Sequence, residues 1–191
     1  ACETAITAET LIIMGEVNTT AEIDVQKIAR QALLGIGYNR KATGFDAYSC
    51  SMLIRLDKQS SDIADGVDLD GAGDQGMMFG YACNETPDLM PLPIMLAHKL
   101  AYRLTKARKH NEIPQLFPDG KTQVTVEYNE RHEPVGIRSI VISAHHMPEI
   151  SEDELKQRIE TFVVNETIGK LDAIGGESGP AKLFINPTGS F

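Results

Sequence analysis

Residues 71–82 form the segment of this chain best suited to bring a reactive group close to a ligand. They read Gly-Ala-Gly-Asp-Gln-Gly-Met-Met-Phe-Gly-Tyr-Ala, so glycines surround Asp74 and an apolar run follows. Glycine lets the backbone adopt left-handed dihedrals and approach a ligand, so the loop can aim Asp74 into a site. No Gly-Lys-Ser/Thr follows, which excludes a P-loop, and the spacing does not fit a dinucleotide fingerprint. Composition alone predicts a turn, with Asp74 as an Asx-turn residue, before a buried strand at residues 77–82.

Charged residues near two strand ends can bind further polar groups. Glu16 follows Gly15 near the end of one predicted strand, and Asp119 and Lys121 flank Gly120 at the opening of another. A lysine ammonium is a suitable point charge for a phosphate. By residue type alone, however, Glu16 is a surface strand acid, Asp119 a turn acid and Lys121 a solvated lysine.

The elements that must position these residues are short strands and amphipathic helices. The first part of the chain predicts strands at 2–7 and 10–18, a helix at 25–34 capped by Asp24, and a strand at 48–56. A long polar stretch at 57–73 is typical of a lid or binding loop and of a boundary between two units. The second part predicts strands at 77–82, 124–128, 135–143 and 182–186, a helix from 91–93 to 109, and a helix from a capping box at 151–154 to about 164. The pattern indicates an α+β fold of antiparallel or mixed sheets with helices on one face.

Composition limits the classes of function. The chain has 191 residues and a net charge of −9, from 27 acids against 18 bases, which argues against nucleic-acid binding as the main role. It has no run of 18 apolar residues, so no membrane span is expected. Three widely spaced cysteines, Cys2, Cys50 and Cys83, suit a reducing cytoplasm better than a disulfide framework.

The order of residues 71–82 resembles the signature of the S-adenosylmethionine synthetase (methionine adenosyltransferase) family. Further motifs follow in that family's order along essentially the whole chain: Ala1-Cys2-Glu3-Thr4, Gly15-Glu16-Val17, Gly44-Phe45-Asp46, Lys58-Gln59-Ser60, Asn84-Glu85-Thr86, Pro118-Asp119-Gly120-Lys121 and Ile185-Asn186-Pro187-Thr188-Gly189. The resemblance implies similar domains of repeated architecture. It places part of an N-terminal domain at 1–63, the signature loop and connection at 64–76, and a central domain at 77–191, with the C-terminal domain absent.

The family resemblance also implies a reaction: the adenosyl group of ATP passes to the sulfur of L-methionine, and phosphate and pyrophosphate are released. It implies that Glu16, Gln59 and Asp74 bind methionine. Asp119 is expected on the ribose hydroxyls, Phe191 on adenine, and Lys121 on the phosphates as the catalytic cation. By residue type alone, Gln59 is an exposed loop amide, and Phe191 is a terminal residue that can fray.

The implied cofactors are potassium and magnesium, with Glu3 as a potassium ligand and no magnesium ligand assigned. His145-His146 is not a metal pair, because adjacent strand residues point to opposite faces. The resemblance further implies a cytoplasmic homodimer or homotetramer that acts on ATP and L-methionine. Neither nucleic acid nor a membrane is expected as a partner.

Some positions depart from the family pattern. Ser61 stands where the family usually has proline, His145 where it has glutamine, and Ser190 where it has arginine. A His-Pro-Asp-Lys segment and an Arg-Lys-bearing segment of the family are missing, so we expect a fragment that is inactive by itself. The alternatives are a non-catalytic regulatory or binding subunit that keeps the fold, and a nucleotide-binding protein of unrelated chemistry.

Overall fold

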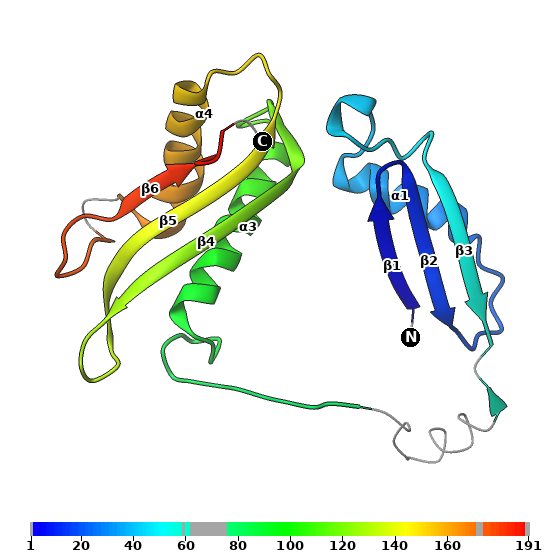
Figure 1. The fold of residues 1–191 in the computed structure, drawn as a ribbon, viewed down its shortest axis with the longest axis horizontal. Helices are drawn as coiled ribbons and strands as arrows, with labels where there is room; N and C mark the ends of the chain where they lie inside the picture. The colour runs from blue at the N-terminus through cyan, green and yellow to red at the C-terminus, as the bar shows by residue number, and fades with distance from the viewer. Residues whose placement is uncertain (1, 59, 62–75, 171–173, 190–191) are drawn as a thin grey trace. The chain divides into compact units, whose positions relative to one another are not determined.

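The chain divides into two compact units, Ala1–Gly80 and Tyr81–Phe191. The structure is a computed structural model, and it describes residues 2–58, 60–61, 76–170 and 174–189 (Figure 1). Each unit has its own sheet and its own buried core. In the part of the chain described, no helix has the length and apolar character needed to cross a membrane.

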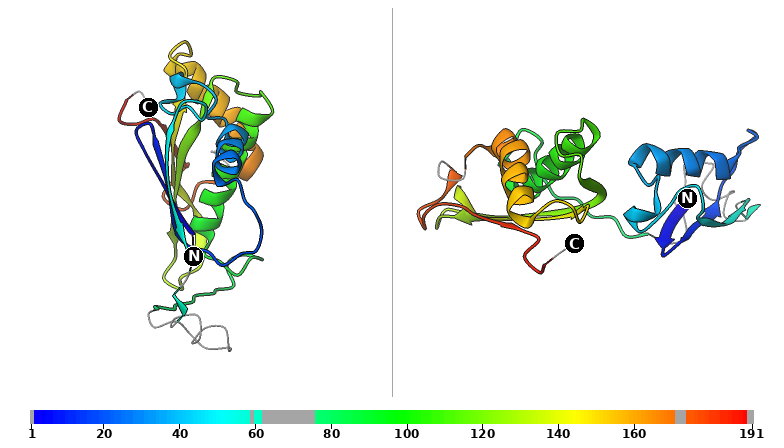
Figure 2. Two further views of the ribbon diagram at one scale, coloured as in Figure 1. Left: turned by 90° about the vertical axis from the view of Figure 1, so that its right-hand side faces the viewer. Right: turned by 90° about the horizontal axis from the view of Figure 1, so that it is seen from above.

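Unit 1 is a three-stranded sheet with one helix on one face. Strands β1 (Cys2–Thr7) and β2 (Thr10–Glu16) form an antiparallel hairpin, and β3 (Ser51–Asp57) pairs with β2 in parallel. Helix α1 (Val25–Ile36) lies across this sheet (Figure 2), and the short helix η1 (Lys41–Thr43) follows it. Asp24 caps α1 as predicted, accepting the Lys27 N–H at 2.9 Å. The buried core holds Leu11, Ile13, Leu33, Phe45, Ala47 and Cys50.

Unit 2 is a longer three-stranded sheet covered by helices on one face. Helix α3 (Leu92–Lys109) precedes β4 (Leu116–Tyr128) and β5 (Pro134–His146), which form an antiparallel hairpin. Helix α4 (Glu152–Ile159), the π-helical turn η2 (Glu160–Val164) and α5 (Asn165–Ile168) lead to β6 (Lys182–Ile185). Strand β6 pairs with β5 in parallel, and the helices lie on one side of this sheet (Figure 2). The largest fully buried side chains belong to this core: Leu100, Ile113, Ile140, Ile142, Leu155, Ile159, Val163 and Val164.

Both units follow the same path of hairpin, helix and returning parallel strand. The strand order is β1-β2-β3 in one sheet and β4-β5-β6 in the other. Each sheet therefore mixes antiparallel and parallel pairing, with its helices on one face. The predicted α+β class is confirmed.

The predicted strand at 77–82 is wrong. These residues pair with no strand in the described part of the chain, and Met77, Met78 and Phe79 are 85%, 84% and 92% exposed. An apolar run forms a strand only where a partner can satisfy its backbone groups and cover its side chains. The predicted helix to residue 164 also changes character, because α4 ends at Ile159 and the π-helical turn follows.

Candidate functional site

In unit 1, carboxylates gather where the parallel strands end. Glu16 is the last residue of β2 and is paired in register with Asp57, the last residue of β3. The Val17 N–H donates to the Asp57 carbonyl at 2.9 Å and fixes the point where the two strands separate. The carboxyl ends of parallel strands meet at one edge of a sheet, where ligands of open α/β sheets commonly bind.

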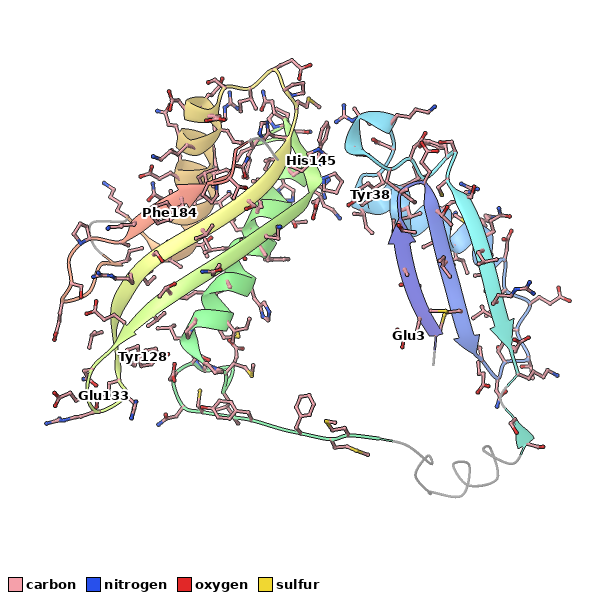
Figure 3. All side chains as sticks on the ribbon, viewed as in Figure 1. Glu3, Tyr38, Tyr128, Glu133, His145 and Phe184 are labelled. Carbon is pink, nitrogen blue, oxygen red and sulfur yellow. The ribbon has the colours of Figure 1, made fainter. Side chains whose placement is uncertain are left out.

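Glu3 shares the face on which Glu16 lies. In the β1–β2 hairpin Glu3 stands opposite Met14, and Glu16 is two residues beyond Met14, so the two acids are diagonal neighbours. Side chains alternate along a strand, and Leu11 and Ile13 point into the core under α1, so Glu3 and Glu16 lie on the other face. Glu3 is exposed near the start of β1 (Figure 3).

A shallow polar hollow adjoins this edge of the sheet. It is lined by Asn18, Thr19 and Thr20, which follow β2, and by Lys58, which follows β3. Gln59 and Asp74, the other predicted methionine contacts, lie outside the described residues. The structure thus brings together Glu16, Glu3 and the hollow, and it leaves Gln59 and Asp74 as predictions.

In unit 2, Asp119 and Lys121 lie near the beginning of β4, and both are exposed. Because β4 and β5 are antiparallel, this beginning lies beside the end of β5, and Lys121 stands opposite Ser143. Gly120 faces α3, because a Cβ added there would meet the Leu104 side chain at 2.9 Å. Strand alternation then places Lys121 on the face away from α3, where it lines a shallow depression with Gln123 and Ser143.

A second hollow lies between α3 and the beginning of β4, with Asp119 among its lining residues. The register of the β4–β5 ladder is irregular between Leu116 and Gly120, which separates this stretch from the regular strand that carries Lys121. The hollow is lined by Ala101, Leu104, Thr105, Arg108, Leu116, Phe117, Pro118, Asp119, Gly120 and Ala144. The predicted ribose residue therefore lies at a concave surface.

His145 adds a titratable ring near this stretch (Figure 3). Its ring packs edge-on against Phe117, with centroids 4.6 Å apart and the planes at 66°. Burial lowers the pKa of His145, and the negative charge of Asp119 opposes that shift only in part. His146 is buried and its Nδ1 lies 2.9 Å from the Met147 carbonyl oxygen, so the two histidines have different surroundings.

Asn186 makes a structural contact that reasoning from sequence missed. It directly follows β6, and its Oδ1 accepts the Ala144 N–H at 2.8 Å while its Nδ2 donates to the Ala144 carbonyl at 3.2 Å. In the sequence Asn186 belongs to a motif of the family resemblance, and the Asn186-Pro187 dipeptide is typical of a turn, but neither signal indicates the contact with Ala144. Phe191, the predicted adenine contact, lies outside the described residues.

Glu85 connects the start of α3 to the end of β4. Its Oε2 accepts the Tyr128 hydroxyl at 2.7 Å and the Leu92 N–H at 2.9 Å. The Leu92 and Tyr128 hydrogen bonds lower the pKa of Glu85, and burial together with the Glu85 carboxylate raises the pKa of Tyr128 to about 12. These hydrogen bonds hold the end of β4 that lies farther from Asp119 and Lys121 (Figure 3 labels Tyr128).

The described residues do not form a complete metal site. Nowhere among them do three or more His, Cys, Asp or Glu side chains gather in a way that could hold an ion. Carboxylate oxygens such as those of Glu3 suit a hard cation, yet a single carboxylate supplies only part of its coordination.

Comparison with known families identifies both units. The S-adenosylmethionine synthetase N-terminal domain matches residues 1–61, and the S-adenosylmethionine synthetase central domain matches residues 69–191. The two matches follow one another along the chain and together span nearly all of it. The chain therefore belongs to the S-adenosylmethionine synthetase family.

Proposed function

We propose that the protein carrying this chain forms S-adenosylmethionine from ATP and L-methionine, with release of phosphate and pyrophosphate. The observation that supports this most strongly is the pair of consecutive matches to two domains of one enzyme family, at 1–61 and 69–191. Charged residues at strand ends of both sheets are compatible with it, because the substrates carry an ammonium group, a carboxylate and a triphosphate.

The bond-forming step requires little proton transfer by the protein. Thioether sulfur is already nucleophilic, so catalysis requires alignment of sulfur with the ribose carbon and stabilisation of the leaving triphosphate. A new carbon–sulfur bond forms as the carbon–oxygen bond to the triphosphate breaks, and the oxygen keeps the bonding electrons. Water then hydrolyses the released triphosphate to phosphate and pyrophosphate. Positioning and electrostatics are therefore the roles open to the side chains of this chain.

On the methionine side, we assign Glu16 to the substrate ammonium group. Its exposed carboxylate lies at the edge of the sheet beside the polar hollow of Asn18 and Lys58, which leaves room for a small amino acid. Gln59 and Asp74 are assigned as further methionine contacts on the resemblance of their motifs.

On the ATP side, Asp119 accepts hydrogen bonds from ribose hydroxyls, and Lys121 acts as the catalytic cation. The Lys121 ammonium stabilises negative charge on the triphosphate as it leaves, which lowers the barrier. Phe191 is assigned to adenine on the resemblance of its motif. A triphosphate requires several cations, and Lys121 is the one assigned to it here, so we expect the 191 residues alone to show no turnover.

Magnesium and potassium are the proposed cofactors. Both are hard cations that take oxygen ligands and shield phosphate charge when bound. Glu3 is assigned as one potassium ligand, and no reaction step is derived through either ion, because the described residues supply no complete ligand set.

We further propose a cytoplasmic homo-oligomer. All three cysteines are free, with Cys50 buried and Cys2 exposed, which suits a reducing compartment.

The test is an S-adenosylmethionine formation assay on the natural protein that carries this chain. Lys121→Met should lower kcat by about 100-fold, the loss typical of one electrostatic contact to developing charge. Lys182→Met is the matched control, because Lys182 is also an exposed strand lysine of the same sheet. Equal activity of Lys121→Met and the unmodified protein would refute the role of Lys121. ATP binding without any product would instead identify a non-catalytic subunit.

A further inference from the structure

Asn186 continues the β5–β6 ladder with its side chain after the backbone has left the sheet. Strand β6 ends with Ile185 opposite Ile142, and the Asn186 N–H still donates to the Ile142 carbonyl at 3.0 Å. Asn186 then adopts φ +43°, in the left-handed region, which turns the chain away from β5. Asparagine tolerates this conformation better than most residues.

The carboxamide of Asn186 replaces the peptide group that a further β6 residue would have presented. Its oxygen accepts the Ala144 N–H at 2.8 Å, and its nitrogen donates to the Ala144 carbonyl at 3.2 Å. Ala144 is 1% exposed, so its backbone groups would lose free energy if they were left without partners. A carboxamide supplies both a donor and an acceptor, whereas a carboxylate supplies only acceptors.

The residue held by Asn186 lies beside the predicted nucleotide residues. Ala144 stands opposite Gly120, which separates Asp119 from Lys121 in β4, and its chain neighbour is His145. After Asn186, the Gly189 N–H donates to the Asn186 carbonyl at 3.0 Å and closes a turn over Pro187 and Thr188. The carboxamide thus connects this turn directly to the strand position next to Asp119 and Lys121.

From this geometry, and resting on the proposed function, we propose that Asn186 is a positioning residue for an adenosine nucleotide. It sets the placement of the turn at 186–189 relative to Asp119 and Lys121, so that one nucleotide can contact both segments. Lys121 itself is held by the β4–β5 ladder and does not depend on Asn186. Loss of the carboxamide should therefore weaken recognition of the nucleoside while leaving recognition of the triphosphate intact.

The test compares ATP and inorganic tripolyphosphate binding by calorimetry in the natural protein that carries this chain. Asn186→Gly keeps the left-handed backbone and removes both side-chain hydrogen bonds, and it should raise the Kd for ATP about tenfold, as the loss of about 1.4 kcal/mol does. The Kd for tripolyphosphate should not change. Asn186→Asp sets a carboxylate oxygen against the Ala144 carbonyl oxygen, so it should raise the Kd for ATP at least as much as Asn186→Gly. In turnover, the KM for ATP should rise and the KM for methionine should stay constant.

Asn129→Gly is the matched control. The Asn129 Oδ1 accepts the N–H groups of Arg131 and Glu133, each at 2.9 Å, in the turn at the other end of the β4–β5 hairpin. This variant should leave both Kd values unchanged even if it lowers stability. Equal weakening of ATP and tripolyphosphate by Asn186→Gly, or no weakening of either, would overturn the positioning role.

A readout independent of function separates this inference from the proposed function. Amide hydrogen exchange at Ala144 should accelerate in Asn186→Gly and stay slow in Asn129→Gly; unchanged exchange would overturn the structural basis of the inference. If the unmodified protein makes S-adenosylmethionine and Asn186→Gly binds ATP equally well, the inference alone fails. If the unmodified protein binds no ATP, the proposed function fails together with the nucleotide role of Asn186, whatever Ala144 exchange shows.

Discussion

Replacing Arg103 with methionine should lower the free energy of unfolding of unit 2. Most of the loss should come from its contact with Glu112 and less from its contact with Glu166. The Arg103 Nη2 lies 2.6 Å from Glu112 and 2.5 Å from Glu166, and its Nε donates to Glu166 at 2.8 Å. Burial opposes the charge of Arg103, but the hydrogen bonds and charges of the two carboxylates outweigh it and raise the pKa of Arg103. The side chain therefore connects α3 to α5 and to the loop after α3.

The exposure of the two partners decides the magnitudes. The Glu166 side chain is 51% exposed, so its pair with Arg103 should contribute less than about 1 kcal/mol. The Glu112 side chain is 31% exposed, but its Oε2 atom is buried and meets Arg103 as an ion pair without hydrogen-bond geometry, so removing Arg103 takes the countercharge from a buried oxygen at a cost of about 1–3 kcal/mol. We expect Arg103→Met to lower the free energy of unfolding by about 2–3 kcal/mol, Glu112→Gln by about 1–2 and Glu166→Gln by under about 1.

Urea-induced unfolding of the single and double variants measures these terms as a double-mutant cycle. Arg158→Met is the control, because Arg158 pairs with Glu154 at 2.9 Å one helical turn away and both side chains are substantially exposed. Its effect should stay below about 0.5 kcal/mol. A coupling of Arg103 to Glu166 that exceeds its coupling to Glu112, or an Arg103→Met effect no larger than that of Arg158→Met, would refute the reasoning from exposure.

Three further variants test packing and titration: two glycine replacements test packing, and one histidine replacement tests titration. Gly136→Ala should destabilise by about 1–3 kcal/mol, because its new Cβ would overlap the backbone of Gly176. Gly35→Ala in α1 meets nothing within 4 Å and should stabilise by about 0.5–1 kcal/mol, so urea unfolding that gives both variants the same sign contradicts the packing argument. The folded-state pKa of His145 lies below the ordinary 6.5, so its neutral form contributes stability that is complete above pH 6.5 and is lost as the pH falls through the folded-state pKa. His145→Gln should weaken the pH dependence of the melting temperature below pH 6.5. An unchanged pH dependence would show that His145 has the same pKa in the folded and unfolded states.

Local sequence patterns predicted most helices and strands of this fold, because the signals for each element lie within a few neighbouring residues. The Asp24 cap fixed the start of α1, and the capping box at 151–154 fixed the start of α4, where the Ser151 hydroxyl accepts the Glu154 N–H at 3.3 Å. The parallel pairings were not predictable, since β2 with β3 and β5 with β6 bring together residues far apart in the chain. The strand predicted at 77–82 was wrong for a related reason. The apolar pattern shows which side chains favour a strand, but it does not show whether a partner strand is present.

The candidate site divides in the same way. Glu16, Asp119 and Lys121 were assigned through the family resemblance of their motifs, because residue type alone predicts a surface strand acid, a turn acid and a solvated lysine. The hydrogen bonds of Asn186 to Ala144 were missed because the two residues are forty-two positions apart and no local pattern carries that contact. The edge packing of His145 on Phe117 was likewise not predictable, because Phe117 lies in the stretch of β4 where the register is irregular.

The shared path of the two units has a consequence for how this protein arose. Each unit runs through a hairpin, a helical crossover and a third strand parallel to the second, in the same spatial order. Such a repeated route is what tandem duplication of one gene segment would produce. The ends of the second strands nevertheless differ, because Glu16 is exposed on the face away from α1 whereas His146 is buried on the face toward the helices, so a shared backbone route does not give the two units the same chemistry.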